Sequence, residues 1–293
     1  MRGLLQSLGG YQSWSDVWVR SGWRVQEKYG IGEVRVLDAR NRMVFEGSRD
    51  ECISYASGEA PPIPPGPVVI LLHGLGCGRL VMTRMERRFR ARGFVTANVG
   101  YPSLRGDVAH HAAAVSSVAA GLAASGATEV HFVVHSLGGL VALAVLARPE
   151  GWKPGRSVFI GSPVQGAALA QALDRVRLYR KLTGPCGLAV LPRTSEDAMM
   201  APKADIGVIA GGNGGRGYNR LLDGDNDGTV GVEETRLPGV EADFLLMSAM
   251  HSTMPLRSAV VDACVSFLLS GRFKSVVRNP GSLHEQALGE RHA

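Results

Sequence analysis

Short apolar runs that alternate with helix-patterned stretches constrain the fold of this chain more than any other feature. Residues 68–72 and 130–134 are continuous apolar runs, which is typical of strands buried on both faces of a parallel sheet. By the same criteria, further strands are predicted at 94–99, 158–160, 206–210 and 244–247, and helices at 80–91, 108–122, 140–147, 169–176 and 259–269. This alternation predicts an α/β fold, with a mostly parallel central sheet and helices on both faces.

The composition divides the chain into four parts. Residues 1–60 contain three of the four tryptophans, and two short strands are predicted there at 33–37 and 43–45. The proline-rich stretch 61–67 is a stiff linker, because proline fixes φ and favours extended neighbours. We therefore expect a small N-terminal accessory segment at 1–60, packed against the main domain and too small to hold a core alone. The α/β domain would span 68–270, followed by a polar C-terminal tail at 271–293.

The charge and aromatic content argue against a nucleic-acid partner. The 293 residues suit one large domain or two small ones, and 45% hydrophobic with 20% charged residues is ordinary for an ordered protein. The net charge is +6, but 32 basic residues are spread among 26 acidic ones without a run of five or more like charges. Only 6% of the residues are aromatic, so no stacking platform for bases is indicated.

Cysteine spacing and hydropathy bear on the location of the protein. The four cysteines lie far apart without a CxxC pair, which favours reduced thiols over a disulfide framework or a zinc site. Residues 1–10 lack the apolar run of a signal peptide, and no run of about 18 apolar residues occurs. We expect a cytoplasmic protein without a transmembrane segment. Peripheral contact with a membrane stays open, and the oligomeric state is not indicated.

The most informative local pattern is a buried strand that runs directly into a serine and a helix. The sequence F-V-V-H-S-L-G-G ends this strand at Ser136 and continues with two glycines. A sharp turn from strand to helix brings backbones together, so it needs small neighbours. The amide of Leu137 would lie at a helix N-terminus, where it can stabilise an oxyanion. The alternative is a serine whose side chain simply caps the helix.

This pattern resembles the nucleophile elbow of α/β hydrolases, with Ser136 as the nucleophile. Val134 stands where family members usually carry glycine, so we expect a slightly opened turn or a displaced helix. The stretch H-G-L-G at 73–76 follows the first central strand and resembles the HG-x-G loop of the family. There the resemblance implies that the backbone amide of Leu75 supplies a second oxyanion donor. The alternative is an ordinary glycine-rich turn. A phosphate-binding loop would need Lys and Ser/Thr at set positions, and these are absent.

The resemblance also implies a carboxylate and a histidine, in the chain order Ser, Asp, His. Of the eight histidines, only His251 lies on the loop that leaves the last predicted strand, where the family carries this residue, whereas His284 and His292 fall in the polar tail. Asp227 fits the family's Asp-x-x-Val spacing, and Asp223 and Asp225 fit it less well. The stretch G-S-P-V-Q-G at 161–166 is similar to the G-T-P-x-x-G loop of many lipases. The resemblance covers about residues 68–270, and we know no counterpart for residues 1–60.

A calcium loop is the competing interpretation of the acidic stretch. The residues Asp223, Asp225, Asp227 and Glu234 also match the pattern D-x-[DN]-x-[DN]-G-x₅-E of an EF-hand. However, the glycine-rich stretch 211–217 lies where an EF-hand needs its entering helix. We therefore expect no metal and no cofactor, with the calcium loop as the weaker alternative.

These patterns lead to one main functional hypothesis and two alternatives. The main hypothesis is a lipase- or carboxylesterase-like serine hydrolase that cleaves a small-molecule or lipid ester through an acyl-enzyme. An amidase or thioesterase would use the same triad, and a non-catalytic relative would act as a binding or scaffold protein. Residues 183–203, with Met199 and Met200, interrupt the alternation of elements. They either cover the carboxyl edge of the sheet, where ligands bind in such folds, or form a surface connection. The acyl-chain length is not set by fold or triad.

Overall fold

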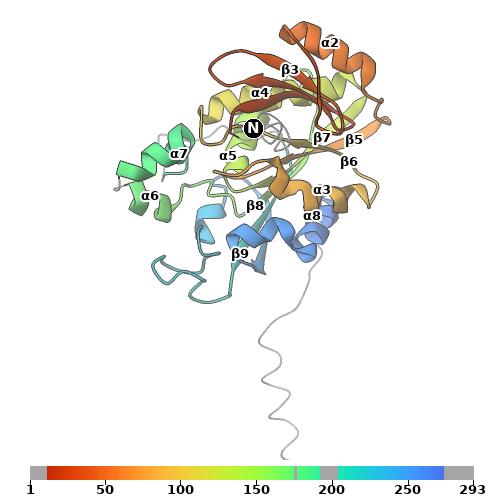
Figure 1. Ribbon diagram of the computed structural model, residues 1–293. Helices are drawn as coiled ribbons and strands as arrows, with labels where there is room; N and C mark the ends of the chain where they lie inside the picture. The colour runs from red at the N-terminus through yellow and green to blue at the C-terminus, as the bar shows by residue number, and fades with distance from the viewer. Residues whose placement is uncertain (1–11, 175–176, 192–203, 274–293) are drawn as a thin grey trace, which may run out of the picture.

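The structure, a computed structural model, describes residues 12–174, 177–191 and 204–273 (Figure 1). Its central sheet contains six strands in the order β10-β9-β8-β7-β5-β6, and every neighbouring pair is parallel. The strands are β5 (Gly66–Leu72), β6 (Val95–Val99), β7 (Ala127–His135), β8 (Pro154–Ile160), β9 (Ile206–Gly212) and β10 (Ala242–Ser248). The predicted parallel sheet is confirmed, as are all six of its predicted strands.

Helices cover both faces of this sheet, as predicted (Figure 1). On one face lie α3 (Thr83–Arg90) and α8 (Ser258–Ser270), and on the other lie α4 (Val108–Ala124) and α5 (Leu137–Ala147). Successive residues of a strand point to opposite faces, so Val69 packs with Phe89 and Phe267, whereas Ile70 packs with residues of α4 and α5. The other helices of this part of the chain are η1 (Arg79–Met82), α6 (Ala168–Asp174), α7 (Arg177–Ala189), η3 (Glu233–Thr235) and η4 (His251–Leu256).

The N-terminal segment forms a second, antiparallel sheet that lies against α4 (Figure 1). This N-terminal sheet contains β1 (Trp14–Arg20), β2 (Trp23–Lys28), β3 (Val34–Leu37) and β4 (Met43–Gly47), followed by α2 (Arg49–Glu59). Its apolar cluster joins residues of β1, β2, β3 and α2 with Ala114 of α4. The predicted strands at 33–37 and 43–45 are confirmed as β3 and β4, whereas β1, β2 and α2 were not predicted.

Strand β1 escapes sequence reasoning because polar side chains interrupt its apolar pattern. Asp16 is fully buried, yet its carboxylate accepts hydrogen bonds from Arg24 (2.6 Å), Gln26 (2.8 Å) and the amide of Gly100 (2.7 Å). These partners compensate the lost hydration of the charge. Because Gly100 follows β6, the same carboxylate joins the N-terminal sheet to the parallel sheet.

No helix within the described ranges is long and apolar enough to cross a membrane. The predicted free thiols are found at Cys52, Cys77, Cys186 and Cys264, none of which is in a disulfide. Met199 and Met200 lie outside the described residues, as do Val176 and the tail beyond 273.

Candidate active site

Ser136 occupies a strained turn between β7 and α5. Its backbone has φ 55° and ψ −124°, and α5 begins at the next residue. Such a conformation costs a non-glycine residue about 1–3 kcal/mol, and it recurs at functional sites. The side chain makes no capping hydrogen bond, so the alternative of an ordinary helix cap is wrong. The turn is held instead by the backbone, because Ser136 N donates to Ile160 O at 3.0 Å and Gly139 N donates to Ser136 O at 2.9 Å.

Glycines permit the close packing around this turn. A Cβ on Gly138 would lie 3.0 Å from the carbonyl oxygens of both Leu72 and His73, and one on Gly139 would lie 2.4 Å from Ser162 Oγ. The predicted need for small neighbours is thus met. The side chain of Val134 is buried in the core between the sheet and helices α4 and α5. Helix α5 begins directly after Ser136.

The loop after β5 lies beside the serine. A Cβ on Gly74 would be 3.0 Å from Ser136 Cβ, so the two loops touch. Neither the amide of Leu75 nor that of Leu137 has a hydrogen-bond acceptor among the described residues. The N–H groups of the two predicted oxyanion donors are therefore without an acceptor among the described residues. Both residues lie on the loops that meet at Ser136.

His73 holds this loop in place through a defined tautomer. Its Nε2 accepts from the amide of Tyr101 at 3.3 Å, and its Nδ1–H donates to the Gly74 carbonyl at 2.9 Å. The hydroxyl of Tyr101 donates to the His73 carbonyl, and the two rings stack with centroids 4.2 Å apart. Burial lowers the pKa of His73 to about 4, so the ring is neutral, as these hydrogen bonds require.

Asp227 and His251 form a hydrogen-bonded pair at the same edge of the sheet. Asp227 Oδ2 accepts from His251 Nδ1 at 2.6 Å, and the carboxylate is almost completely buried. Its other oxygen, Oδ1, accepts from the amides of Thr229 (2.9 Å) and Val230 (2.7 Å). In addition, His251 N donates to Asp227 O at 2.9 Å. Backbone groups therefore fix the carboxylate and the imidazole relative to each other.

The position of Gly161 shows where the Asp227–His251 pair lies relative to Ser136. A Cβ on Gly161 would lie 3.1 Å from Asp227 Oδ2 and 3.3 Å from His251 Nδ1. The preceding residue, Ile160, accepts the hydrogen bond from the amide of Ser136. The carboxyl ends of β7 and β8 and the loops after β9 and β10 thus bring Ser136, Asp227 and His251 to one edge. The Ser136 hydroxyl itself makes no hydrogen bond to a described residue.

His135 is a member of this site for which no role was predicted from the sequence. Its ring lies against that of His251, with centroids 4.7 Å apart, and its Nε2–H donates to the His251 carbonyl at 3.1 Å. Burial lowers the pKa of His135 well below its usual value; a charge on the neighbouring His251 imidazole adds to this lowering, and the hydrogen bond to the His251 carbonyl opposes it. A neutral His135 therefore supports the loop of His251 through this hydrogen bond. The only signal in the sequence was its position next to Ser136.

Two of the other acidic residues in the calcium pattern have hydrogen-bond partners of their own. Asp225 accepts from the amides of Asn213, Gly214 and Asn226, and Glu234 accepts from those of Ala168 and Gly231. Asp223 is exposed, and Asp227 is bound to His251. No group of three or more Asp, Glu, His or Cys side chains in the described part of the chain is arranged to hold a metal ion. Each of these loop carboxylates, apart from that of Asp223, is directed to a different backbone segment or to the imidazole, an arrangement that disfavours the EF-hand interpretation.

Comparisons with known proteins agree with this architecture. The profile of the Alpha/beta hydrolase family matches residues 69–262. Among solved structures, the mature lipase BlEst2 of Bacillus licheniformis is 19% identical with a TM-score of 0.55, over 69% of this chain and 94% of that one. The esterase EaEST of Exiguobacterium antarcticum is 16% identical with a TM-score of 0.51, over 72% and 94% of the two chains. A comparison with curated protein sequences finds no match. The family match spans the parallel sheet from β5 to α8, with the strained serine and the Asp227–His251 pair inside it, and the chain belongs to the alpha/beta hydrolase family.

Proposed function

We propose that this chain is a serine hydrolase that cleaves carboxylic esters through an acyl-enzyme on Ser136. The observation that carries the proposal is the conformation of Ser136, which keeps a costly positive φ although its hydroxyl caps no helix. Backbone strain of this kind persists only where the surrounding structure imposes it, and here it turns the serine out of the strand. The imidazole–carboxylate pair at the same sheet edge supplies the base that such a nucleophile needs.

In the proposed reaction, Ser136 Oγ attacks the ester carbonyl carbon while His251 Nε2 accepts the hydroxyl proton. Asp227 keeps the proton of the imidazole on Nδ1, so that Nε2 is the free base, and it stabilises the imidazolium that forms. The negative oxygen of the tetrahedral intermediate would be held by the amides of Leu75 and Leu137. The latter is also the first amide of α5, where the helix dipole favours negative charge.

The intermediate then collapses as His251 donates its proton to the leaving alkoxide, which departs as an alcohol. Water attacks the acyl group on Ser136 with His251 again as the base, and the carboxylic acid and the free serine are regenerated. The absence of a hydrogen bond between Ser136 and His251 is compatible with these reaction steps, because catalytic hydrogen bonds often tighten only when substrate binds.

The substrate class is proposed as a small-molecule or lipid ester. Two structures that share this fold bear the names lipase and esterase, which favours esters over amides and thioesters. Matched nitrophenyl ester, anilide and thioester substrates would measure the preference directly. A series of p-nitrophenyl esters from acetate to palmitate would give the acyl length.

The proposal is tested by covalent labelling. A fluorophosphonate probe should label the wild-type chain, and Ser136→Ala should abolish labelling and lower kcat about a millionfold. Ser157→Ala is the matched control, because Ser157 is a buried serine of the same sheet and lies on β8 away from the proposed chemistry. Undiminished labelling of Ser136→Ala would refute the assignment, and a wild-type chain that hydrolyses none of the esters would favour the non-catalytic alternative.

A further inference from the structure

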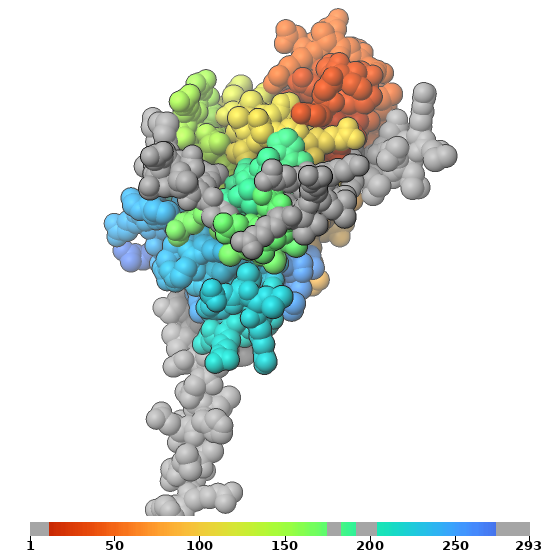
Figure 2. All heavy atoms as spheres, turned by 90° about the vertical axis from the view of Figure 1, so that its left-hand side faces the viewer, coloured from red at the N-terminus to blue at the C-terminus, as the bar shows by residue number. Residues whose placement is uncertain are grey.

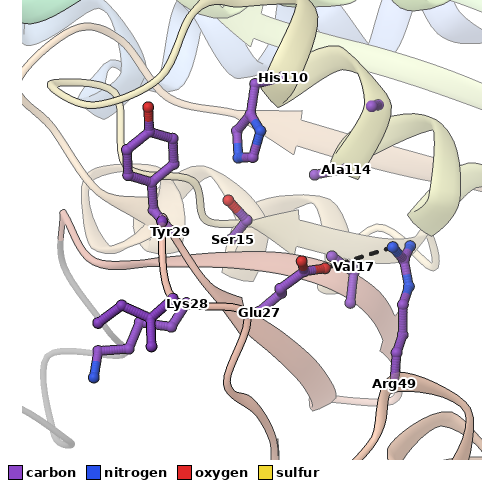
Figure 3. Close-up of a pocket in the computed structure, with 12 residues that line it drawn as sticks. Ser15, Val17, Glu27, Lys28, Tyr29, Arg49, His110 and Ala114 are labelled. Carbon is purple, nitrogen blue, oxygen red and sulfur yellow. Dashed lines mark hydrogen bonds and ion pairs between the residues drawn. The ribbon is translucent and has the colours of Figure 1, made fainter.

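A second cavity lies between the N-terminal sheet and α4, away from the hydrolytic site (Figure 3). Its volume is about 450 Å³, within the range of small-molecule sites. Polar side chains that line it are Ser15, Glu27, Lys28, Tyr29, Arg49 and His110. None of its lining residues belongs to the elbow, the loop after β5 or the Asp227–His251 pair, so it is separate from the proposed hydrolytic site.

A buried hydroxyl without a partner is directed into this cavity. Ser15 is only 2% exposed, and its Oγ makes no hydrogen bond in the described structure. Figure 3 shows the Oγ pointing toward the space between Tyr29 and His110. A buried hydroxyl normally finds a partner, since leaving it unpaired costs free energy. The carboxylate of the neighbouring Asp16 accepts three hydrogen bonds, so of these two residues only Ser15 has a side-chain oxygen without a hydrogen-bond partner.

The cavity also contains one anion and one cation that are poorly paired with each other. Glu27 Oε2 and Arg49 Nη1 are 3.5 Å apart, a long ion pair, and their side chains are 37% and 45% exposed. Arg49 is held in position because its Nη2 donates to Ser117 Oγ at 2.8 Å. Lys28, the other cation of the lining, is bound to Glu33 at 2.7 Å and points away in Figure 3. With Lys28 paired to Glu33, the charges of Glu27 and Arg49 balance each other in the lining, and both side chains are partly exposed.

We propose that this cavity binds a small zwitterion of the free amino acid class. The ammonium group would lie against the Glu27 carboxylate and donate to Ser15 Oγ, and the carboxylate would lie against the Arg49 guanidinium. A ligand with only one of the two charges would meet a like charge in the cavity, which disfavours simple amines and simple acids. The apolar side chain would pack on Val17, Ala113 and Ala114. Tyr29 and His110, which contact edge to face with centroids 5.1 Å apart, would border it on the other side.

Calorimetric titration of the full chain tests this proposal with three matched probes. L-leucine carries both charges, 3-methylbutylamine is leucine without the carboxylate, and 4-methylpentanoate is leucine without the ammonium group. Leucine should bind, and each single-charge probe should bind at least about tenfold more weakly, because one charged contact is lost and one repulsion remains. Equal affinities of the three probes, or no binding of leucine up to about 10 mM, would overturn the proposal.

Variants identify the contacts. Glu27→Gln and Arg49→Gln should each weaken leucine binding about tenfold or more, and Ser15→Ala about threefold, because it removes one neutral hydrogen bond. Glu46→Gln is the control, since Glu46 is an exposed acid of the same sheet that does not line the cavity. Melting curves verify that each variant is folded, and Ser15→Ala should not lower the Tm because its hydroxyl has no partner to lose. Unchanged leucine binding in both Glu27→Gln and Arg49→Gln would place any binding elsewhere. Leucine binding is measured without ester turnover. A failure of this proposal is therefore distinguishable from a failure of the proposed esterase function.

Discussion

The Asp227 carboxylate accepts a hydrogen bond from an imidazole, and this distinguishes it from Asp225 and Glu234 in the same loop, which accept from backbone amides. Oδ1 is held by two amides, so Oδ2 can face only His251. Asp227→Asn should therefore keep the fold but leave the wrong imidazole tautomer, lowering kcat for p-nitrophenyl acetate by about four orders of magnitude. Steady-state kinetics with a melting curve for the variant would measure this. Asp223→Asn, at an exposed position in the same loop, should leave kcat within about twofold.

The carboxylates of Asp225 and Glu234 have a different task, because they accept amides from neighbouring segments. Asp225→Asn and Glu234→Gln should act on stability and lower the Tm by several degrees, since charged acceptors are each worth about 1.5–3 kcal/mol. A chelator should change neither the Tm nor kcat of the wild type. A fall in Tm on chelation, reversed by added calcium, would contradict this account of the loop.

Two buried histidines make the stability depend on pH. Burial lowers the pKa of both His73 and His111 from 6.5 to about 4, so the folded state binds fewer protons than the unfolded state between these values. Their contribution is fully present above pH 6.5 and is lost as the pH falls toward 4. Urea denaturation across this range should show a falling free energy of unfolding, and His111→Phe should make the fall shallower. An identical slope in wild type and variant would exclude His111 as a cause.

At the scale of elements, helix α7 reaches the loop that precedes α4. Gly184 has φ 62° and ψ −164°, and a Cβ there would lie 2.3 Å from the Leu104 carbonyl oxygen. Figure 2 shows the green residues of α7 on the surface directly below the yellow residues before α4. Leu104 also approaches Gly76 of the loop after β5. This contact favours the hypothesis that the segment 183–203 covers the carboxyl edge of the sheet, although residues 192–203 lie outside the described ranges.

Gly184→Ala should displace α7 from this loop, because alanine fits neither the positive φ nor the space. We expect the ratio of palmitate to acetate ester turnover to change at least about threefold, since an apolar cover contacts the long chain more than the short one. Gly58→Ala is the matched control, because Gly58 lies in α2 with no atom within 4 Å of its added Cβ. If chain-length selectivity stays constant in a folded Gly184→Ala variant, the segment is a connector.

At the scale of the whole molecule, the N-terminal sheet and the parallel sheet share buried contacts. Ala114 of α4 completes the apolar cluster of the N-terminal sheet, and Asp16 joins Arg24 to the amide of Gly100. The two sheets should therefore unfold together. Trp14, Trp18 and Trp23 report on the N-terminal sheet by fluorescence, whereas circular dichroism at the helix band reports mainly on α3, α4, α5 and α8. Coincident transitions in urea are expected, and an earlier fluorescence transition would show that the N-terminal sheet unfolds on its own.

Local patterns in the sequence determined the parallel sheet, its helices and the turn at Ser136. Strands such as β5 and β7 are recognisable because burial on both faces demands a continuous apolar run, and the glycines after Ser136 are required by close backbone contacts. Helix α2 was also within reach, because Ser48 and Glu51 form a capping box whose S-x-x-E signature is visible in the sequence.

Only the tertiary structure decided which polar groups meet. Asp223, Asp225, Asp227 and Glu234 fit one calcium pattern in sequence, yet Asp227 alone faces His251, 24 residues further along the chain. In the same way, the burial of Asp16 depends on the distant Gly100, and the contact of His135 with His251 depends on two loops that meet across the sheet. Hydrophobic periodicity is a local property of the chain, whereas the partner of a buried charge or imidazole is set by packing between segments far apart in sequence.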